Sequence, residues 1–170
     1  MARLSPVGSL RQSPKKLLDR VRQPLSSVVP GPTTALGNWY AHVLFWTSQV
    51  ALLVNERALL PVLMPLAPAA TLAARFPAQL ATVLHELGAN VQFVDSEIDA
   101  MAEMVISNTA NRSIVGVMNE FAFLADGYRE YLQEPDLLAL TIKLGGTPCG
   151  PLKGNSPARS LKELAAARRP

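Results

Sequence analysis

The chain of 170 residues is 49% hydrophobic and 17% charged, which is typical of one globular domain and excludes an intrinsically disordered chain. Its net charge of +3 is concentrated at the ends, because residues 1–24 carry six Lys and Arg against one Asp and residues 151–170 carry five against one Glu. The acidic remainder argues against a folded DNA reader, which would concentrate positive charge on its folded face.

One domain in three parts is expected. These parts are a basic N-terminal lead with a short helix over 1–24, a globular α+β core over 25–150, and a basic C-terminal helix and tail over 151–170. Residues 1–8 are predicted to be an unstructured lead. Ser13 and Pro14 then supply the N-cap and first-turn proline of a short amphipathic helix. Residues 23–36, rich in Pro, Ser, Gly and Thr, are typical of a linker or an irregular wrap.

A β-hairpin over 39–54 is predicted from alternating residues. One face of its first strand holds Tyr40, His42, Leu44 and Trp46, and the other holds Ala41, Val43 and Phe45. Because both faces are largely apolar, the hairpin is expected to be central in a small, mostly antiparallel sheet. Further strands are predicted near 59–64, where prolines favour an edge, and near 103–108. Residues 58–74 lack charge, but three prolines favour a buried strand and a helix start over a membrane span.

Shorter helices are predicted over 77–87, ended by Gly88, over 136–144, and from Ser156 to residue 164. His85 and Glu86 begin a zinc-helix pattern, but its second histidine position is Ala89, so no metal site is expected there.

Four carboxylates, Asp95, Glu97, Asp99 and Glu103, cluster in sequence without calcium-loop spacing. We interpret Ser96 as the cap of a helical turn there, whose dipole the acidic residues favour. The one cysteine, Cys149, excludes an internal disulfide and fits a reducing compartment. No base or cation lies near it in sequence, so a structural role is expected. The basic N-terminus has no continuous apolar stretch behind it, so no secretory signal is expected.

The strongest periodic signal predicts a central helix over 111–132, capped by Asn111. Its apolar stripe begins at Ile114 and should pack on the sheet. Its opposite face carries Arg112, Gly116, Asn119, Phe123 and Glu130, and a glycine and a phenylalanine are unusual on a face where Lys and Glu normally predominate. Two interpretations stay open for that face. Either the helix is covered on both sides, with Gly116 admitting another backbone, or Arg112, Ser113, Asn119 and Asn111 form a recognition surface.

An N-R-S-x-x-G-x-M-N pattern runs from Asn111 to Asn119, after Trp39-Tyr40-Ala41 with Leu44-Phe45 and after Val54-Asn55-Glu56. On these motifs the chain, from Leu10 to Leu164, resembles an uncharacterised bacterial domain-of-unknown-function family of the six-nine-three-three type. The resemblance implies an intracellular, cytoplasmic bacterial α+β domain and brings no activity, cofactor or mechanism with it. The candidate signature residues are Asn111, Arg112, Ser113, Gly116, Asn119, Trp39, Asn55 and Glu56.

No nucleophile elbow, catalytic cysteine context, phosphate loop or zinc spacing is found, so no cofactor and no metal are expected. The leading hypothesis is a small interaction or regulatory domain that binds a protein partner through Arg112 and Asn119. An alternative is a small enzyme or ligand-binding domain with a polar site of Asn55, Glu56, Asn108, Arg112 and Asn119, in which Glu56 is the base. A third is salt-dependent nucleic-acid association through the basic ends.

Overall fold

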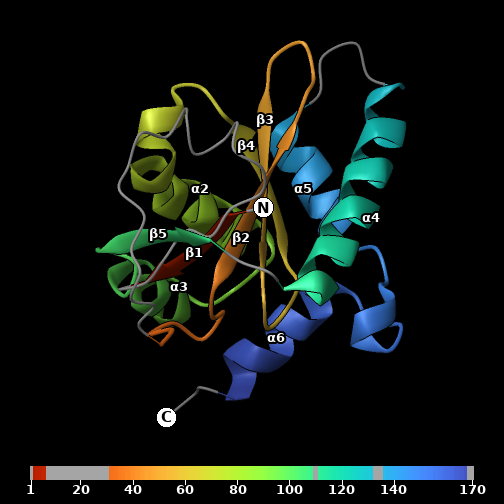
Figure 1. Cartoon of the computed structure of the whole chain (residues 1–170). Helices are drawn as coiled ribbons and strands as arrows, with labels where there is room; N and C mark the ends of the chain where they lie inside the picture. Colours follow the sequence, from red (N-terminus) through yellow and green to blue (C-terminus); the bar gives the residue numbers. More distant parts are fainter. Residues whose placement is uncertain (1, 7–30, 109–110, 132–135, 168–170) are drawn as a thin grey trace.

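The computed structural model describes residues 2–6, 31–108, 111–131 and 136–167, and of residues 2–6 and 105–108 it describes the backbone alone. The strands are β1 (Ala2–Pro6), β2 (Trp39–Leu44), β3 (Val50–Asn55), β4 (Pro61–Pro65) and β5 (Met104–Asn108). The α-helices are α2 (Leu72–Glu86), α3 (Val91–Asp99), α4 (Arg112–Arg129), α5 (Leu137–Gly145) and α6 (Pro157–Ala167). This arrangement confirms the predicted α+β class (Figure 1). The predicted helix after Ser13 and most of the predicted linker lie outside the described residues.

The main sheet has three antiparallel strands in the order β2-β3-β4, with Tyr40 opposite Val54 and Leu52 opposite Leu63. Every residue of β3 is buried and β3 is the central strand, as predicted, but β2 lies at the other edge of this sheet, so the prediction that the whole hairpin is central was wrong for its first strand. Strand β4 has a proline at each end and forms an edge, as predicted. Helix α5 covers that edge, where the Leu63 amide donates a hydrogen bond of 2.9 Å to Thr141 Oγ1. The buried hydroxyl of Thr141 thereby pairs a backbone N–H group at the edge of the sheet.

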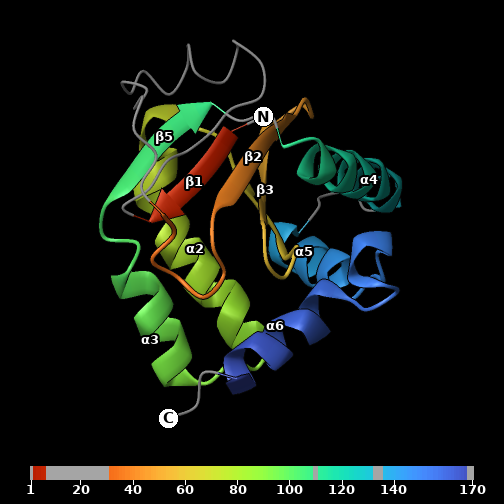
Figure 2. The same ribbon diagram turned by 60° about the horizontal axis from the view of Figure 1, so that its bottom comes forward.

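Strand β5 confirms the predicted strand near 103–108, but it pairs with β1 and does not extend the three-stranded sheet. The two strands are antiparallel, with Ala2 opposite Asn108 and Pro6 opposite Met104, and they lie beside β2 (Figure 2). The prediction that residues 1–8 are unstructured was therefore wrong. Residues 2–6 alternate apolar Ala2, Leu4 and Pro6 with polar Arg3 and Ser5, which is a short strand signal that the prediction overlooked, and their backbone pairs with β5.

Helices cover both faces of the sheet, so there are two cores (Figures 1 and 2). Helices α2, α3 and α6 pack with Trp39, Ala41 and Val43 on one face. Helices α4 and α5 pack on the other face with Tyr40 and Trp46. This division confirms the predicted alternation along β2. No helix within the described residues is long and apolar enough to cross a membrane.

Two helix starts differ from the predictions. Helix α2 begins at Leu72 and contains Pro77 in its interior, because its earlier turns bury Leu72 and Phe76 in the core. Its predicted end is confirmed, since Gly88 has a φ of +76°. Helix α3 is capped by Asn90, whose side chain accepts a hydrogen bond of 2.8 Å from the Phe93 amide. Ser96 lies inside that helix, so its predicted capping role was wrong.

The last two helices begin where the sequence predicted. Asp136 caps α5 by accepting hydrogen bonds from the amides of Leu138 and Ala139. Helix α6 begins at Pro157 and runs three residues past the predicted end, to Ala167. Leu161 of α6 is buried in the core, so this helix is part of the fold. The basic residues of 7–24 and 168–170 lie outside the described residues.

Candidate functional site

A chain of hydrogen bonds ties the start of α4 to the end of the hairpin. Glu56 Oε1 accepts hydrogen bonds from the backbone amide of Asn38 at 3.1 Å and from its Nδ2 at 2.6 Å. Glu56 Oε2 accepts one from the Tyr40 hydroxyl at 3.2 Å, and that hydroxyl accepts one from Asn111 Nδ2 at 3.5 Å. Asn111 Oδ1 also accepts from the Ile114 amide at 3.4 Å, which confirms the predicted N-cap. The first turn of α4 is therefore held in a fixed position on the sheet.

Gly37 lies directly against the Glu56 carboxylate. Its φ is +75°, and a Cβ added there would lie 2.7 Å from Glu56 Oε1. Glycine is required at this position for two reasons, because the backbone is left-handed and because Glu56 already fills the space. Glu56 is thus used by the fold to hold the loop that leads into β2.

Two further signature residues lie in the interior. Asn55 donates from Nδ2 to the Leu36 carbonyl at 2.7 Å and accepts from the Leu60 amide at 2.7 Å through Oδ1. Trp39 is fully buried and packs edge-on against Phe76, with ring centroids 4.8 Å apart. The hydrogen bonds of Asn55 satisfy backbone groups of Leu36 and Leu60 in the two loops at the end of the hairpin. The ring of Trp39 fills the core under α2.

The outer face of α4 is exposed to solvent. We define this outer face by the residues Arg112, Gly116, Asn119, Phe123, Asp126 and Glu130, all of which are exposed. Phe123 keeps 78% of its surface accessible. The interpretation that the helix is covered on both sides was therefore wrong, because α4 is the outermost element on its side of the sheet (Figure 1). Ser113 is exposed beside this face, and Asn111 lies at its start.

Gly116 has free space beside it. A Cβ added there would meet no atom of the described residues within 4 Å. The suggestion that this glycine admits a neighbouring backbone within the fold was wrong. Glycine lowers the stability of a helix, and no contact within the described residues explains why α4 has a glycine at position 116.

The end of α4 is held to the hairpin tip by contacts that the sequence analysis missed. Asp126 accepts a hydrogen bond of 2.6 Å from Trp46 Nε1, and the Arg129 guanidinium lies 4.9 Å from the centroid of the Trp46 ring. Lys143 of α5 lies over Tyr128, with its Nζ 3.9 Å from the ring centroid. Trp46 at the hairpin tip was the signal that could have revealed these contacts, because an indole N–H needs an acceptor when it is buried. With both ends anchored, α4 presents its outer face on a rigid support.

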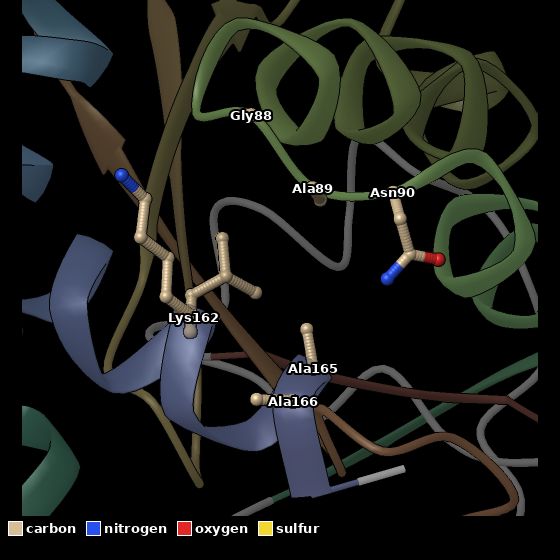
Figure 3. Close-up of a pocket in the computed structure, with 7 residues that line it drawn as sticks. Gly88, Ala89, Asn90, Lys162, Ala165 and Ala166 are labelled. Carbon is tan, nitrogen blue, oxygen red and sulfur yellow. The ribbon is translucent and has the colours of Figure 1, made fainter. Parts of the chain in front are cut away.

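A hollow of about 150 Å³ lies between the turn after α2 and helix α6 (Figure 3). It is lined by Gly88, Ala89, Asn90, Leu161, Lys162, Ala165 and Ala166. Lys162 is the one ionisable side chain among these residues, and Asn90 already caps α3. A second hollow of about 470 Å³ is lined by apolar side chains of α2, α3 and the segment into β5. Neither hollow holds the convergent acid and base that catalysis requires.

The residues of the proposed polar site do not meet in either hollow. Asn55 and Glu56 are bonded to the loops of the fold, whereas Arg112 and Asn119 face solvent on α4. The side chain of Asn108 lies outside the described residues. Within the described parts of the chain, no three His, Cys, Asp or Glu side chains are placed to hold a metal ion.

The remaining polar candidates are used in packing. Glu97, from the carboxylate cluster, is buried and accepts hydrogen bonds from the amides of Ala35 at 2.6 Å and Leu36 at 3.1 Å. Burial raises the pKa of the Cys149 thiol, which disfavours the reactive thiolate. Burial lowers the pKa of His42 on β2 and so favours its neutral form.

Comparison with known proteins gives one match. A family model described as "Domain of unknown function (DUF6933)" matches residues 12–160, which include α4 and the whole three-stranded sheet. No curated protein and no solved structure matches the chain. The geometry of the described residues is therefore the basis for any statement about function.

Proposed function

The chain belongs to the DUF6933 family, whose function is unknown, and we propose that it is an interaction domain that binds a protein partner through the outer face of α4. The observation that supports this proposal is the exposed Phe123 in a face that also carries an exposed glycine and Arg112. A solvated helix face normally carries Lys and Glu, which keep the helix soluble at no cost in stability.

The composition of the outer face resembles that of interface centres. Aromatic residues and arginine are enriched in interfaces, where they supply most of the binding free energy. Phe123 offers a large apolar surface, and Arg112 offers a planar donor that no ion pair occupies among the described residues. Because Asn111 and Asp126 anchor the helix, little conformational entropy would be lost when a partner binds.

The test is quantitative affinity capture with the full chain immobilised. Wild-type protein should retain a protein partner. Phe123→Asp and Arg112→Glu should each reduce the captured amount at least about tenfold, the first because a large apolar contact is lost and the second because a charge is reversed. Phe45→Asp is the matched control, because Phe45 is also an exposed aromatic, at 62%, but lies at the hairpin tip. Capture that is insensitive to changes at Phe123 and Arg112, or the absence of both a captured partner and self-association of the chain, would contradict the proposal.

A further inference from the structure

We propose that the partner is a second copy of this chain, bound by antiparallel pairing of the two α4 helices through their outer faces about a two-fold axis. This inference rests on the proposed function and names the occupant of the same surface. A two-fold axis requires one self-complementary patch, in which every contact between a residue of one copy and a residue of the other is repeated with the two copies exchanged. Three features of the outer face meet this requirement.

The first feature is the spacing of the exposed residues. Positions 112, 116, 119, 123, 126 and 130 alternate by four and three residues, which is the heptad spacing of a helix that packs along another helix. This stripe runs the length of α4, mostly on the side away from the sheet, and Asp126 at its margin also accepts the hydrogen bond from Trp46 Nε1. The buried stripe of α4 is already used by the sheet and α5, so these six positions form a second seam.

The second feature is the pairing of a large side chain with an open space. In one antiparallel register, Phe123 lies opposite Asn119 of the second copy. Its ring then enters the hole formed by Gly116, Asn119, Glu120 and Phe123, which is the four-residue hole that receives a knob in helix pairing. Because no described atom lies within 4 Å of a Cβ placed on Gly116, the ring has room at that corner. The two-fold axis places both phenylalanine rings beside each other at the centre.

The third feature is charge. The same register places Arg112 opposite Glu130 of the second copy, and the two-fold axis forms this pair twice. Both side chains are exposed and make no ion pair among the described residues. A parallel pair would place Arg112 against Arg112 and Glu130 against Glu130, which is repulsive. Charge complementarity therefore selects the antiparallel arrangement and a second copy of this chain.

The seam contributes one large apolar side chain from each copy, and α4 has 18 residues. Such a contact is small in comparison with a standard interface, so the dimer is expected to be weak and reversible. We therefore expect a dissociation constant in the micromolar range or weaker. Added salt should weaken the association, because the two ion pairs at its ends are exposed.

Sedimentation velocity of the full chain, from low micromolar to near-millimolar concentration, tests this inference. Wild-type protein should change from monomer to dimer across the range. Arg112→Glu and Glu130→Arg should each lower the association constant at least about tenfold, because each places like charges opposite one another twice. The double variant Arg112→Glu with Glu130→Arg should restore it to within about threefold of wild type, because the pair is re-formed with reversed signs.

Arg159→Glu is the matched control, since Arg159 is an exposed arginine on α6 and its reversal should leave the association unchanged. Circular dichroism of each variant checks that the fold is kept, as expected for exposed positions. A wild-type monomer at every concentration would overturn the second-copy inference, and so would a double variant that stays monomeric while folded. If the protein is monomeric but capture still depends on Phe123, the proposed function survives and this inference alone fails.

Discussion

Replacing Gly116 by alanine tests whether the outer face of α4 is free in the isolated molecule. Glycine inside a helix costs about 1 kcal/mol relative to alanine, because it loses more backbone entropy on folding. An added Cβ meets no described atom within 4 Å, so no steric cost offsets this gain. We expect Gly116→Ala to raise the free energy of unfolding by about 1 kcal/mol and the melting temperature by about 2–4 °C.

Urea titration measures the change, at a protein concentration where sedimentation velocity detects the monomer alone. Gly127→Ala is the matched control, because Gly127 is an exposed glycine of the same helix whose Cβ would also meet nothing among the described residues. It lies nearer the helix end, so its gain should be smaller. If Gly116→Ala destabilises the protein while Gly127→Ala does not, the space beside Gly116 is occupied in the free chain. The outer face of α4 would then not be free in the isolated molecule.

Three further changes test the contacts that position α4 and the sheet. Gly37→Ala should cost about 2–4 kcal/mol in urea titration, because the left-handed φ is strained for alanine and the new Cβ displaces Glu56. Thr141→Val should cost about 1–3 kcal/mol, because it leaves the buried Leu63 amide without an acceptor; an unchanged midpoint would exclude this role. The pKa of His42 is lowered from 6.5 in the folded state, so its contribution is complete above about pH 6.5 and is lost as the pH falls toward the lower folded value. Unfolding measured between about pH 5 and 8 should therefore show a decline on acidification that His42→Gln reduces.

The sheet could be predicted because its signals are local and agree with one another. Residues 39–46 and 50–54 are two apolar runs joined by the short polar segment Thr47-Ser48-Gln49, and the structure has the antiparallel hairpin that this pattern predicts. The prolines of β4 cannot serve a central strand, so its edge position followed from covalent chemistry. The cap Asn111 could be predicted because it precedes a long periodic run.

The incorrect predictions concern places where the local sequence is ambiguous and contacts with distant parts of the chain decide the structure. Asn90 and Ser96 both have the chemistry of a cap, and the sequence does not say which of them begins α3. The choice follows from Glu97, which is drawn inward to accept the amides of Ala35 and Leu36, about sixty residues earlier in the chain. Strand β1 was missed because its short alternation is ambiguous without its pairing with β5.

The outer face of α4 shows a different limit. The period of the sequence gives the residues that share a face, but it does not give the layer in which the helix lies. If α4 were covered on both sides, burial would explain its unusual outer face. Because α4 is an outermost helix, burial within the fold does not explain it. Since α4 is outermost, the instability caused by Gly116 and the exposure of Phe123 have no compensation among the described residues. The proposed contact with a second copy would supply that compensation, because it would cover the phenylalanine and use the space that the glycine leaves.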